Sequence, residues 1–543
     1  MKKFFSVLLT VLTAAVLAFS LTACEKPSEG LDYELNENQN AYYVTGLGTC
    51  ADTNIVIPSE YQGLPVIGIG NRAFYGCTSL TSITIPDSVT SIGDSAFSNC
   101  PALTNVTIGN SVTSIGICAF IGCSALTNIT IPDSVTSIGE GAFSHCSSLT
   151  SINIPYGVTN IADYAFENCT SLTSIYIPDS VTNIGNYAFK NCPLNYNEYD
   201  NAYYLGKKSN PYLVLVKAKN ADIASCSIND NTQFIHSYAF RNCTSLTSIT
   251  IPDSVTSIGN HAFENCTSLT NIYIPDSVTN IGFSAFAECD AVETATIPAT
   301  AISFIPKPNL KTVVITGETS IKAYAFNNCT SLTNVTIGNS VTSIGYYAFY
   351  GCTSLTNVII GNSVSSIENW AFSHCTSLTS IAIPESVTSI GNHAFEKCPL
   401  TYNEYDNAYY LGNESNPYLA LVKVKTKFIT SCSINKNTKI IGMYVFSTCS
   451  LTSVAIPTGV SSIGESTFSN CSSLASVTIP ESVTSIGENA FLYCISLTSI
   501  TYNGTMEQWD AVAKHDSWDA NTGDYTIHCT DGDITKTKLP TDA

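Results

Sequence analysis

Cysteine is the residue type whose number and spacing first suggest chemistry in this chain. The chain has 22 cysteines in 543 residues, and 16 of them recur at a step of mostly 23 residues, each three positions after a phenylalanine. These 16 residues are Cys77, Cys100, Cys123, Cys146, Cys169, Cys192, Cys243, Cys266, Cys289, Cys329, Cys352, Cys375, Cys398, Cys449, Cys471 and Cys494. Side chains stacked at one repeated position point the same way, which is poor disulfide geometry, so we expect small buried core residues.

The remaining cysteines and the seven histidines offer little further chemistry. Any disulfide would form among five cysteines outside the ladder: Cys50, Cys118, Cys226, Cys432 and Cys529. The chain contains no CxxC motif, so a zinc site has no support. His528 and Cys529 are adjacent, and on an extended chain they point to opposite faces, which argues against a nucleophile pair. Four histidines share two repeated positions, and we interpret them as drift at solvent positions: His145, His374, His261 and His393.

Acidic residues dominate the charge of the chain. With 22 basic and 42 acidic residues the formal net charge is −20, which excludes a generic nucleic-acid binder. Five aspartates share one repeated position and could hold a cation: Asp87, Asp133, Asp179, Asp253 and Asp276. Asn110 and Tyr156 interrupt this column, so we interpret the aspartates as turn residues. The sequence predicts no catalytic residue, no metal site and no cofactor, and therefore no enzyme.

The N-terminus predicts export. Lys2 and Lys3 precede an apolar run from Phe4 to about Phe19, and Leu-Thr-Ala then leads into Cys24. This ending resembles the bacterial lipobox, whose cysteine is acylated and becomes the new N-terminus. We expect residues 1–23 to be a lipoprotein signal peptide and Cys24 to be the membrane anchor, with an ordinary cleaved signal as the alternative. Residues 24–40 then form an acidic, flexible tether, and the protein is exported and membrane-anchored at the bacterial cell surface.

The dominant feature is an internal repeat. The segment LTSITIPDSVTSIGDSAFSNC, from Leu80 to Cys100, returns every 23 residues, and the cysteine ladder counts 16 coils. Leu80, Ile83 and Ile85 alternate with polar residues, which is typical of a strand with one buried face. Pro-Asp-Ser then predicts a corner, and Asp94 to Cys100 predicts one helical turn. A single coil cannot bury its own apolar face, so the coils must stack into a solenoid over residues 41–500.

Three segments interrupt the rhythm. Two inserts, near residues 195–225 and 401–431, are copies of each other at an offset of 206 and predict β-hairpins. Each hairpin is either a projecting, lysine-bearing binding loop or a spacer that packs on the coils, and we favour the spacer. An irregular, proline-containing coil near residues 290–325 is expected to bend the array. Residues 501–543 are expected to form a C-terminal cap and tail, because the last coil would otherwise expose an open sheet edge.

The repeat pattern LxxIxIPxSVTxIGxxAFxxC closely resembles the BspA-type leucine-rich repeat of bacterial surface proteins. The resemblance covers about residues 77–500. It implies a β-rich leucine-rich-repeat solenoid with short helical turns, carried by a surface lipoprotein that adheres to host proteins or to other cells.

The candidate binding residues are on the exposed strand positions. These columns are largely Ser, Thr and Asn, with Tyr176 and Tyr273 standing out. A flat, hydroxyl-rich face with a few tyrosines suits an extended protein or glycan partner. The leading hypothesis is a non-enzymatic adhesive surface protein, and the alternative is a structural spacer or envelope protein with no specific ligand. Adhesion predicts aromatic side chains clustered on one face, and a spacer predicts none.

Overall fold

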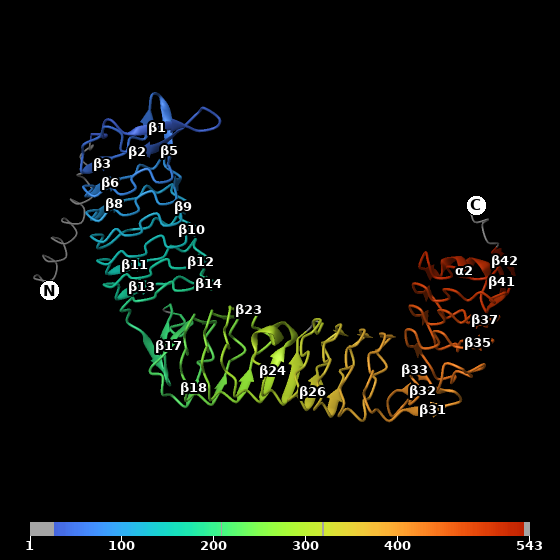
Figure 1. Cartoon of the computed structure of the whole chain (residues 1–543). Coiled ribbons are helices and arrows are strands. Elements are labelled where there is room, and N and C mark those ends of the chain that lie inside the picture. Colours follow the sequence, from blue (N-terminus) through green and yellow to red (C-terminus); the bar gives the residue numbers. More distant parts are fainter. Residues whose placement is uncertain (1–25, 208, 318–319, 537–543) are drawn as a thin grey trace, which may run out of the picture. The chain divides into compact units, whose positions relative to one another are not determined.

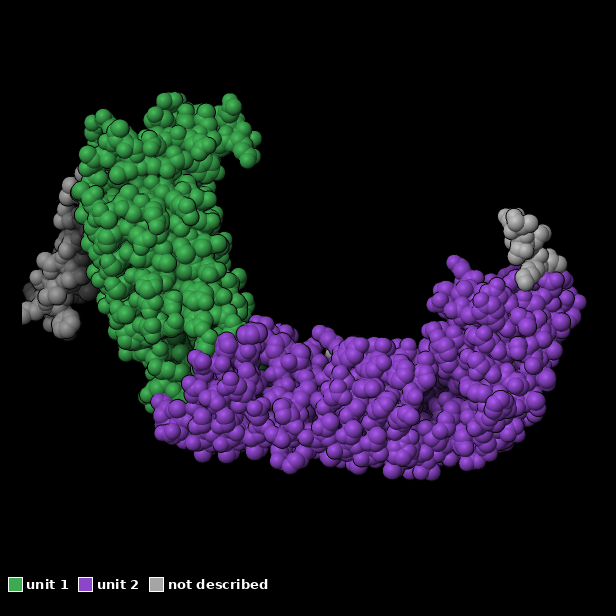
Figure 2. All heavy atoms as spheres, viewed as in Figure 1, with its two compact units in different colours: residues 1–218, 231–239, 258–260 green, residues 219–230, 240–257, 261–543 purple. Residues whose placement is uncertain are grey.

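The computed structural model describes residues 26–207, 209–317 and 320–536, and divides the chain into two compact units. Unit 1 comprises Met1–Ala218, Asn231–Ala239 and Ile258–Asn260, and unit 2 comprises Lys219–Asp230, Phe240–Ser257 and His261–Ala543 (Figure 2). The signal peptide and Cys24 lie outside the described residues. Within each unit the chain winds as a solenoid, so the predicted fold class is confirmed.

A single coil shows why the repeat folds in this way. In β6 (Ser82–Thr84) only Ile83 is buried, while its two polar neighbours are half-buried. The strand pairs in parallel with β8 (Asn105–Thr107), so that Ile83 lies beside Val106, 23 residues further along the chain. The same register carries Ser91 and Ile92 of β7 (Ser91–Ile92) onto Ser114 and Ile115. Apolar residues of successive coils therefore stack into continuous columns, as the period-two pattern predicts.

The strands of unit 1 fall into two rows, and Figure 1 labels most of these strands. One row and the hairpin strand attached to it are β1 (Asp32–Leu35), β2 (Tyr42–Gly46), β4 (Glu60–Tyr61), β5 (Leu64–Ile69), β7, β9 (Ser114–Ile115), β10 (Ser137–Ile138), β12 (Asn160–Ile161) and β14 (Asn183–Ile184). The other row is β3 (Asn54–Val56), β6, β8, β11 (Ser151–Asn153) and β13 (Ser174–Tyr176). The insert of this unit adds β15 (Asn197–Tyr199), β16 (Ala202–Leu205), β17 (Val214–Ala218) and β19 (Phe234–Ile235).

Unit 2 repeats the arrangement, and β21 (Ser257–Ile258) has one residue in each unit. Its longer strands are β18 (Ser225–Ser227), β20 (Ser248–Thr250), β22 (Asn271–Tyr273), β24 (Thr294–Pro298), β25 (Thr312–Thr316), β26 (Asn334–Ile337), β28 (Asn357–Ile359), β35 (Ser453–Ala455), β37 (Ser476–Ile479), β39 (Ser499–Tyr502), β41 (Tyr525–Cys529) and β42 (Gly532–Lys536). Its two-residue strands are β23 (Asn280–Ile281), β27 (Ser343–Ile344), β29 (Ser366–Ile367), β30 (Ser389–Ile390), β34 (Ile440–Ile441), β36 (Ser462–Ile463), β38 (Ser485–Ile486) and β40 (Ala513–Lys514).

The segment expected to form a helical turn is not helical. Ser95 and Asn99 both have left-handed backbones, with φ of 54° and 56°. The amides of Ser95, Phe97 and Asn99 consequently donate to carbonyls of the next coil, each at 2.7 Å, instead of to carbonyls within their own turn. The same two positions are left-handed in all 16 repeats, where they precede Ala-Phe or its equivalent and the ladder cysteine. Hydrogen bonding between coils therefore replaces hydrogen bonding within a helix.

The core of the solenoid is a ladder of phenylalanines and cysteines. In unit 1, Phe74, Phe97 and Phe120 are fully buried, and successive rings stack with centroids 5.3 and 5.0 Å apart. Twelve of the sixteen ladder thiols donate to a phenylalanine carbonyl of the preceding coil, as Cys123 does to Phe97 O at 3.2 Å, whereas Cys243 donates to Asn220 O. Fourteen ladder cysteines are buried and two, Cys77 and Cys398, are half-buried, so the ladder consists of small core residues, most with a satisfied donor.

The inserts add antiparallel strands to the stack. In the first insert, β15, β16 and β17 form a meander, and β17 then pairs in parallel with β19 of the following coil. The second insert repeats this with β31 (Asn403–Tyr405), β32 (Ala408–Leu411), β33 (Ala420–Val424) and β34. Lys217 lies over the ring of Tyr196, with its Nζ 5.1 Å from the centroid, and Lys423 lies 4.4 Å from the centroid of Tyr402. The lysine-bearing strands are therefore part of the coil sheets.

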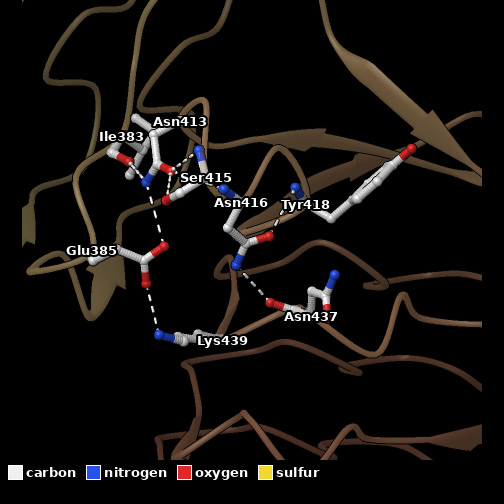
Figure 3. A network of polar contacts seen from close by, with 8 residues as sticks. All are labelled: Ile383, Glu385, Asn413, Ser415, Asn416, Tyr418, Asn437 and Lys439. Atoms are coloured by element: carbon white, nitrogen blue, oxygen red, sulfur yellow. Dashed lines mark hydrogen bonds and ion pairs between the residues drawn. The ribbon is translucent and has the colours of Figure 1, made fainter.

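A polar network fastens the loop of the second insert to the coils on either side (Figure 3). Asn413 Nδ2 donates to Ile383 O at 3.0 Å, and Asn416 Nδ2 donates to Asn437 O at 2.8 Å. Glu385 bridges the two sides, because it accepts from Asn413 at 3.4 Å and pairs with Lys439 at 2.6 Å. The hydrogen bond with Lys439 and, less strongly, that with Asn413 lower the pKa of Glu385.

The irregular coil is a shortened one. Thr294 of β24 lies beside Thr312 of β25, only 18 residues further on, and the 3-10 helix η1 (Ala299–Phe304) fills the return path. Pro298 precedes η1 with φ of −65°, so the proline fixes the backbone where the shortened turn begins.

The C-terminal segment covers the end of the stack. β41 pairs in parallel with β39, and β42 folds back antiparallel on β41. The helix α2 (Met506–Ala511) begins at a capping box between Thr505 and Gln508. Trp518 packs edge-on against Phe491, the last ring of the ladder, with centroids 5.8 Å apart. The open core is thereby closed by an aromatic residue of a different element.

Candidate interaction surface

The residue before each Ala-Phe pair is the position that builds the candidate surface. Its left-handed backbone turns the side chain out of the core, while the 23-residue register stacks it on its counterpart in the next coil. In four successive coils of unit 2 this position is aromatic, and the residues are Tyr324, Tyr347, Trp370 and His393. The repeat therefore produces a row of rings outside the core.

These four rings form an unbroken stack. The centroids of Tyr324 and Tyr347 are 5.4 Å apart, those of Tyr347 and Trp370 are 5.7 Å apart, and those of Trp370 and His393 are 4.3 Å apart. The ring planes are inclined by 17°, 14° and 27°, respectively. A row of this kind holds its side chains in one arrangement before any partner arrives, so little conformational entropy remains to be lost on binding.

Neighbouring aromatic residues widen the row. Tyr346 and Tyr350 contact Tyr347 at centroid distances of 4.3 and 4.9 Å, and Tyr350 contacts His374 at 4.9 Å. We call this set of seven residues the aromatic surface: Tyr324, Tyr346, Tyr347, Tyr350, Trp370, His374 and His393. Tyr324 is 53% exposed and Tyr346 is 40% exposed, although both are large hydrophobic residues. Loss of surrounding water and a hydrogen bond with Tyr346 raise the pKa of Tyr347, so the Tyr347 hydroxyl stays protonated near neutral pH.

Unit 1 carries a smaller row at the same repeat position. Tyr164 and Tyr187 stack with centroids 5.2 Å apart, and Tyr187 contacts Tyr238 at 4.9 Å. Lys190 Nζ lies 4.7 Å from the centroid of Tyr187 and pairs with Glu167. In this row, unlike in the stack of the aromatic surface, two members hydrogen-bond to each other through their hydroxyls, Tyr187 and Tyr238.

The two tyrosines predicted from the sequence lie on strands, one in each unit. Tyr176, at the end of β13, is 37% exposed, and its hydroxyl is 2.9 Å from that of Tyr156. Tyr273, at the end of β22, donates from its hydroxyl to Asp253 Oδ1 at 3.4 Å. Each has local polar partners, and neither belongs to the aromatic surface.

The aspartates of the shared repeat position and the histidines make polar contacts with other residues of the solenoid. Asp87 Oδ1 accepts from the amide of Asn110 in the next coil at 2.7 Å, and Asp179 pairs with Lys207 at 2.9 Å. Among the residues that the structure describes, no three His, Cys, Asp or Glu side chains are grouped so as to hold a metal ion. His528 Nδ1 lies 2.9 Å from Asp533 Oδ1 on the neighbouring strand. His374 and His393 contact rings of the aromatic surface, and His393 is exposed, as expected for a solvent position.

The match to a family model agrees with this architecture. The BspA type leucine rich repeat region matches residues 67–195, 218–308, 302–415 and 424–515, which is more than half of the chain. The chain belongs to the BspA-type leucine-rich repeat family. Among curated proteins, none is significantly similar to this family member.

Several solved structures resemble this BspA-type repeat protein. A leucine-rich repeat protein from Bacteroides ovatus is 26% identical, with 93% of this chain and 99% of that chain covered and a TM-score of 0.33. A leucine-rich cell surface protein from Faecalibacterium prausnitzii is 26% identical, with 90% and 99% covered and a TM-score of 0.27. A leucine-rich repeat protein of T. pallidum is 30% identical, with 31% and 89% covered and a TM-score of 0.27. No helix within the described ranges is long and apolar enough to cross a membrane.

The sequence did contain a signal for the aromatic surface of this BspA-type array. The residue before Ala-Phe is aromatic in four coils spaced by 23 residues, at positions 324, 347, 370 and 393, and again at Tyr164, Tyr187, Tyr238 and His261, while several other coils place Ser, Gly or Asn there. The sequence predicts the strand columns as the binding face, and the histidines of this turn column are interpreted from it as drift at solvent positions. Small and polar residues at the same position in other coils are those that tolerate a left-handed backbone, which hid the aromatic run.

Proposed function

We propose that this protein is a surface lipoprotein, anchored through Cys24, which binds a protein partner through the aromatic surface and so adheres to host proteins or other cells. The observation that carries the proposal is the stack of Tyr324, Tyr347, Trp370 and His393 outside the core of four successive coils. Tyrosine and tryptophan are the residue types that most often dominate binding energy at protein interfaces. The stacked rings lie outside the solenoid's core, so core packing does not explain their presence. Binding of a partner would explain it.

Two general features support this role. Repeat arrays offer extended, rigid surfaces on which each coil contributes a few side chains to one partner, and leucine-rich repeats commonly bind proteins. Charged residues make up only 12% of the chain. A low charge density reduces the desolvation penalty when a partner covers this surface.

The test compares variants of the full-length protein, purified in mild detergent, for binding to a panel of extracellular-matrix proteins. Tyr347→Asn with Trp370→Asn removes the centre of the aromatic surface, and Asn suits the backbone because Asn489 occupies the same repeat position with φ of 53°. We expect binding at least about tenfold weaker, since two interface hot spots are each worth more than ~1 kcal/mol. Tyr164→Asn is the matched control at the same repeat position in unit 1, and it should bind like the unmodified protein.

The remaining outcomes separate the alternatives. If Tyr176→Thr with Tyr273→Thr abolishes binding and Tyr347→Asn with Trp370→Asn does not, recognition lies on the strand face that carries Tyr176 and Tyr273. Binding to glycans alone would reassign the partner class. Failure to bind any member of the panel would favour the structural spacer.

A further inference from the structure

A cavity of about 440 Å³ opens in unit 2 where the second insert interrupts the stack. It lies between the coil that ends at Cys398, the strand β33, and the coil that begins with β34. Its apolar lining includes Phe395, Val424, Met443 and Val445, and its volume is within the range of small-molecule sites. The phenylalanine ladder is interrupted here, because the insert occupies the space where the next coil would stack.

The first insert provides an internal comparison, because the two inserts are copies at an offset of 206 residues. At the first copy, Tyr187 and Tyr238 contact each other with ring centroids 4.9 Å apart and a bond between their hydroxyls. The equivalent residues at the second copy are His393 and Tyr444, which both line the cavity. The hydroxyl contact of the first copy therefore has no counterpart at the second copy, because residue 393 has no hydroxyl.

One substitution accounts for part of the open volume. His236 is buried in the first copy, where its Nδ1 lies 3.2 Å from the carbonyl of Ser237. Gly442 replaces this histidine in the second copy, so the imidazole is absent. A Cβ at Gly442 would lie 3.1 Å from Val445 Cγ2, whereas the residue equivalent to Val445 in the first copy is Ala239. A side chain at position 442 would therefore crowd Val445, and both residues line the cavity.

Lysine side chains are concentrated around the cavity at the second insert. Lys397, Lys423 and Lys427 line the cavity, and two of them replace the uncharged Asn191 and Ala221 of the first copy. Lys427 Nζ donates to Val445 O at 3.1 Å, and Lys423 Nζ lies over Tyr402. None of the three has an ion-pair partner within the described part of the chain, while the one lining carboxylate, Glu396, pairs with His393 at 3.1 Å. In a chain with a net charge of −20, three ammonium groups without carboxylates indicate an anionic ligand.

We propose that this cavity binds a small aromatic carboxylate. The ring occupies the apolar floor between Phe395, Met443 and Tyr402, and the carboxylate faces the ammonium groups of Lys397 and Lys427. Methionine and aromatic side chains suit a flat ring, and an ammonium group gives a carboxylate charge-assisted hydrogen bonds. The site is a small-molecule site and goes beyond the proposed binding of a protein by the aromatic surface.

Isothermal titration of the full-length protein in detergent micelles tests the proposal, with phenylacetate as the probe. Acetate keeps the charge without the ring, and phenylacetamide keeps the ring without the charge. We expect saturable binding of phenylacetate, and binding of the other two at least about tenfold weaker. Lys397→Asn with Lys427→Ala restores the residues of the first copy and should weaken phenylacetate binding at least about tenfold.

A second variant tests the cavity itself. The closed variant, Gly442→His with Val445→Ala, restores the residues of the first copy and places an imidazole at the cavity wall, and we expect it to abolish phenylacetate binding while the circular dichroism spectrum stays unchanged. Tyr347→Asn should leave phenylacetate binding intact, which separates this site from the aromatic surface. The proposal is overturned if phenylacetate does not bind, if phenylacetamide binds equally well, or if the closed variant binds like the unmodified protein.

Discussion

At the scale of single residues, the buried ladder cysteine Cys123 is predicted to be chemically inert. Burial raises the pKa of Cys123 to about 12, and its thiol donates to Phe97 O. A thiol with this pKa is almost fully protonated at pH 8, and the protonated form does not react with iodoacetamide. We expect Cys123 to remain unlabelled in the folded protein and to react in 8 M urea, as read by peptide mass spectrometry. Cys118, outside the ladder and only half-buried, is the internal control and should react sooner; equal rates in the folded state would contradict the prediction.

Sequence reasoning at this scale succeeded where a residue type repeats and failed where a position repeats with changing types. The ladder cysteines were predicted as buried core residues because Phe and Cys recur without exception. The aromatic surface was missed because Tyr347 and Trp370 share their position with Ser95 and Asn489 in other coils. What unites these residues is a left-handed backbone, a conformational property that no single residue type reports.

At the scale of elements, the phenylalanine ladder is predicted to supply much of the stability of unit 1. Phe143 is fully buried and stacks between Phe120 and Phe166, with centroid distances of 5.4 and 5.6 Å. Phe143→Ala should lower the free energy of unfolding by about 3–5 kcal/mol, because it leaves a cavity that the stacked coils cannot fill. Urea denaturation followed by circular dichroism measures this change. Tyr75→Ala is the control, since Tyr75 is 56% exposed, and a comparable loss in that variant would refute the ladder's special role.

The loop of the second insert gives a second prediction for an element. Asn413 Oδ1 accepts from the amides of Ser415 and Asn416 at 3.0 and 2.9 Å, while its Nδ2 reaches Ile383 in the preceding coil. Asn413→Ala removes all of these bonds, so hydrogen exchange of the amides at 415 and 416 should accelerate at least about tenfold. Lys436→Ala, an exposed change nearby, should leave exchange unaltered. Unchanged exchange in Asn413→Ala would show that the loop is held by other contacts.

The elements also show where sequence patterns are ambiguous. Asp94 to Cys100 has the capping side chains of a helical turn, and the structure forms successive non-helical turns there. Asp94 Oδ1 accepts from the amide of Ile117 in the next coil at 2.7 Å, so the carboxylate caps a neighbouring coil and not a helix. Polar residues that cap helices also satisfy turns, and the partner lies 23 residues away, where local sequence patterns carry no information.

At the scale of the whole molecule, the repeat made the architecture predictable. Coils that cannot bury their apolar faces alone must share a core, and this requirement fixes a solenoid with closed ends. The cap meets that requirement through Trp518 on Phe491 and through β42 on β41. The cavity beside the second insert could not be predicted in the same way. It depends on the absence of one buried imidazole and on the size of residue 445, which are differences between two copies and not features of the repeat.

Attachment of the whole molecule to a membrane is predicted to depend on Cys24. The apolar run that ends in Leu-Thr-Ala-Cys24 predicts acylation of the thiol, and acyl chains on the new N-terminus anchor the chain to a bilayer. Bacteria grown with radioactive palmitate should label the unmodified protein and not Cys24→Ala, because the substitution removes the acylated sulfur. Cys50→Ala, a change outside the signal, should keep the label. Since covalent lipid is the only membrane contact that the sequence predicts, Cys24→Ala should also move the protein from the detergent phase to the aqueous phase in Triton X-114 partitioning. Retention of Cys24→Ala in the detergent phase without label would show that the uncleaved apolar run, and not an acyl group, holds the protein at the membrane.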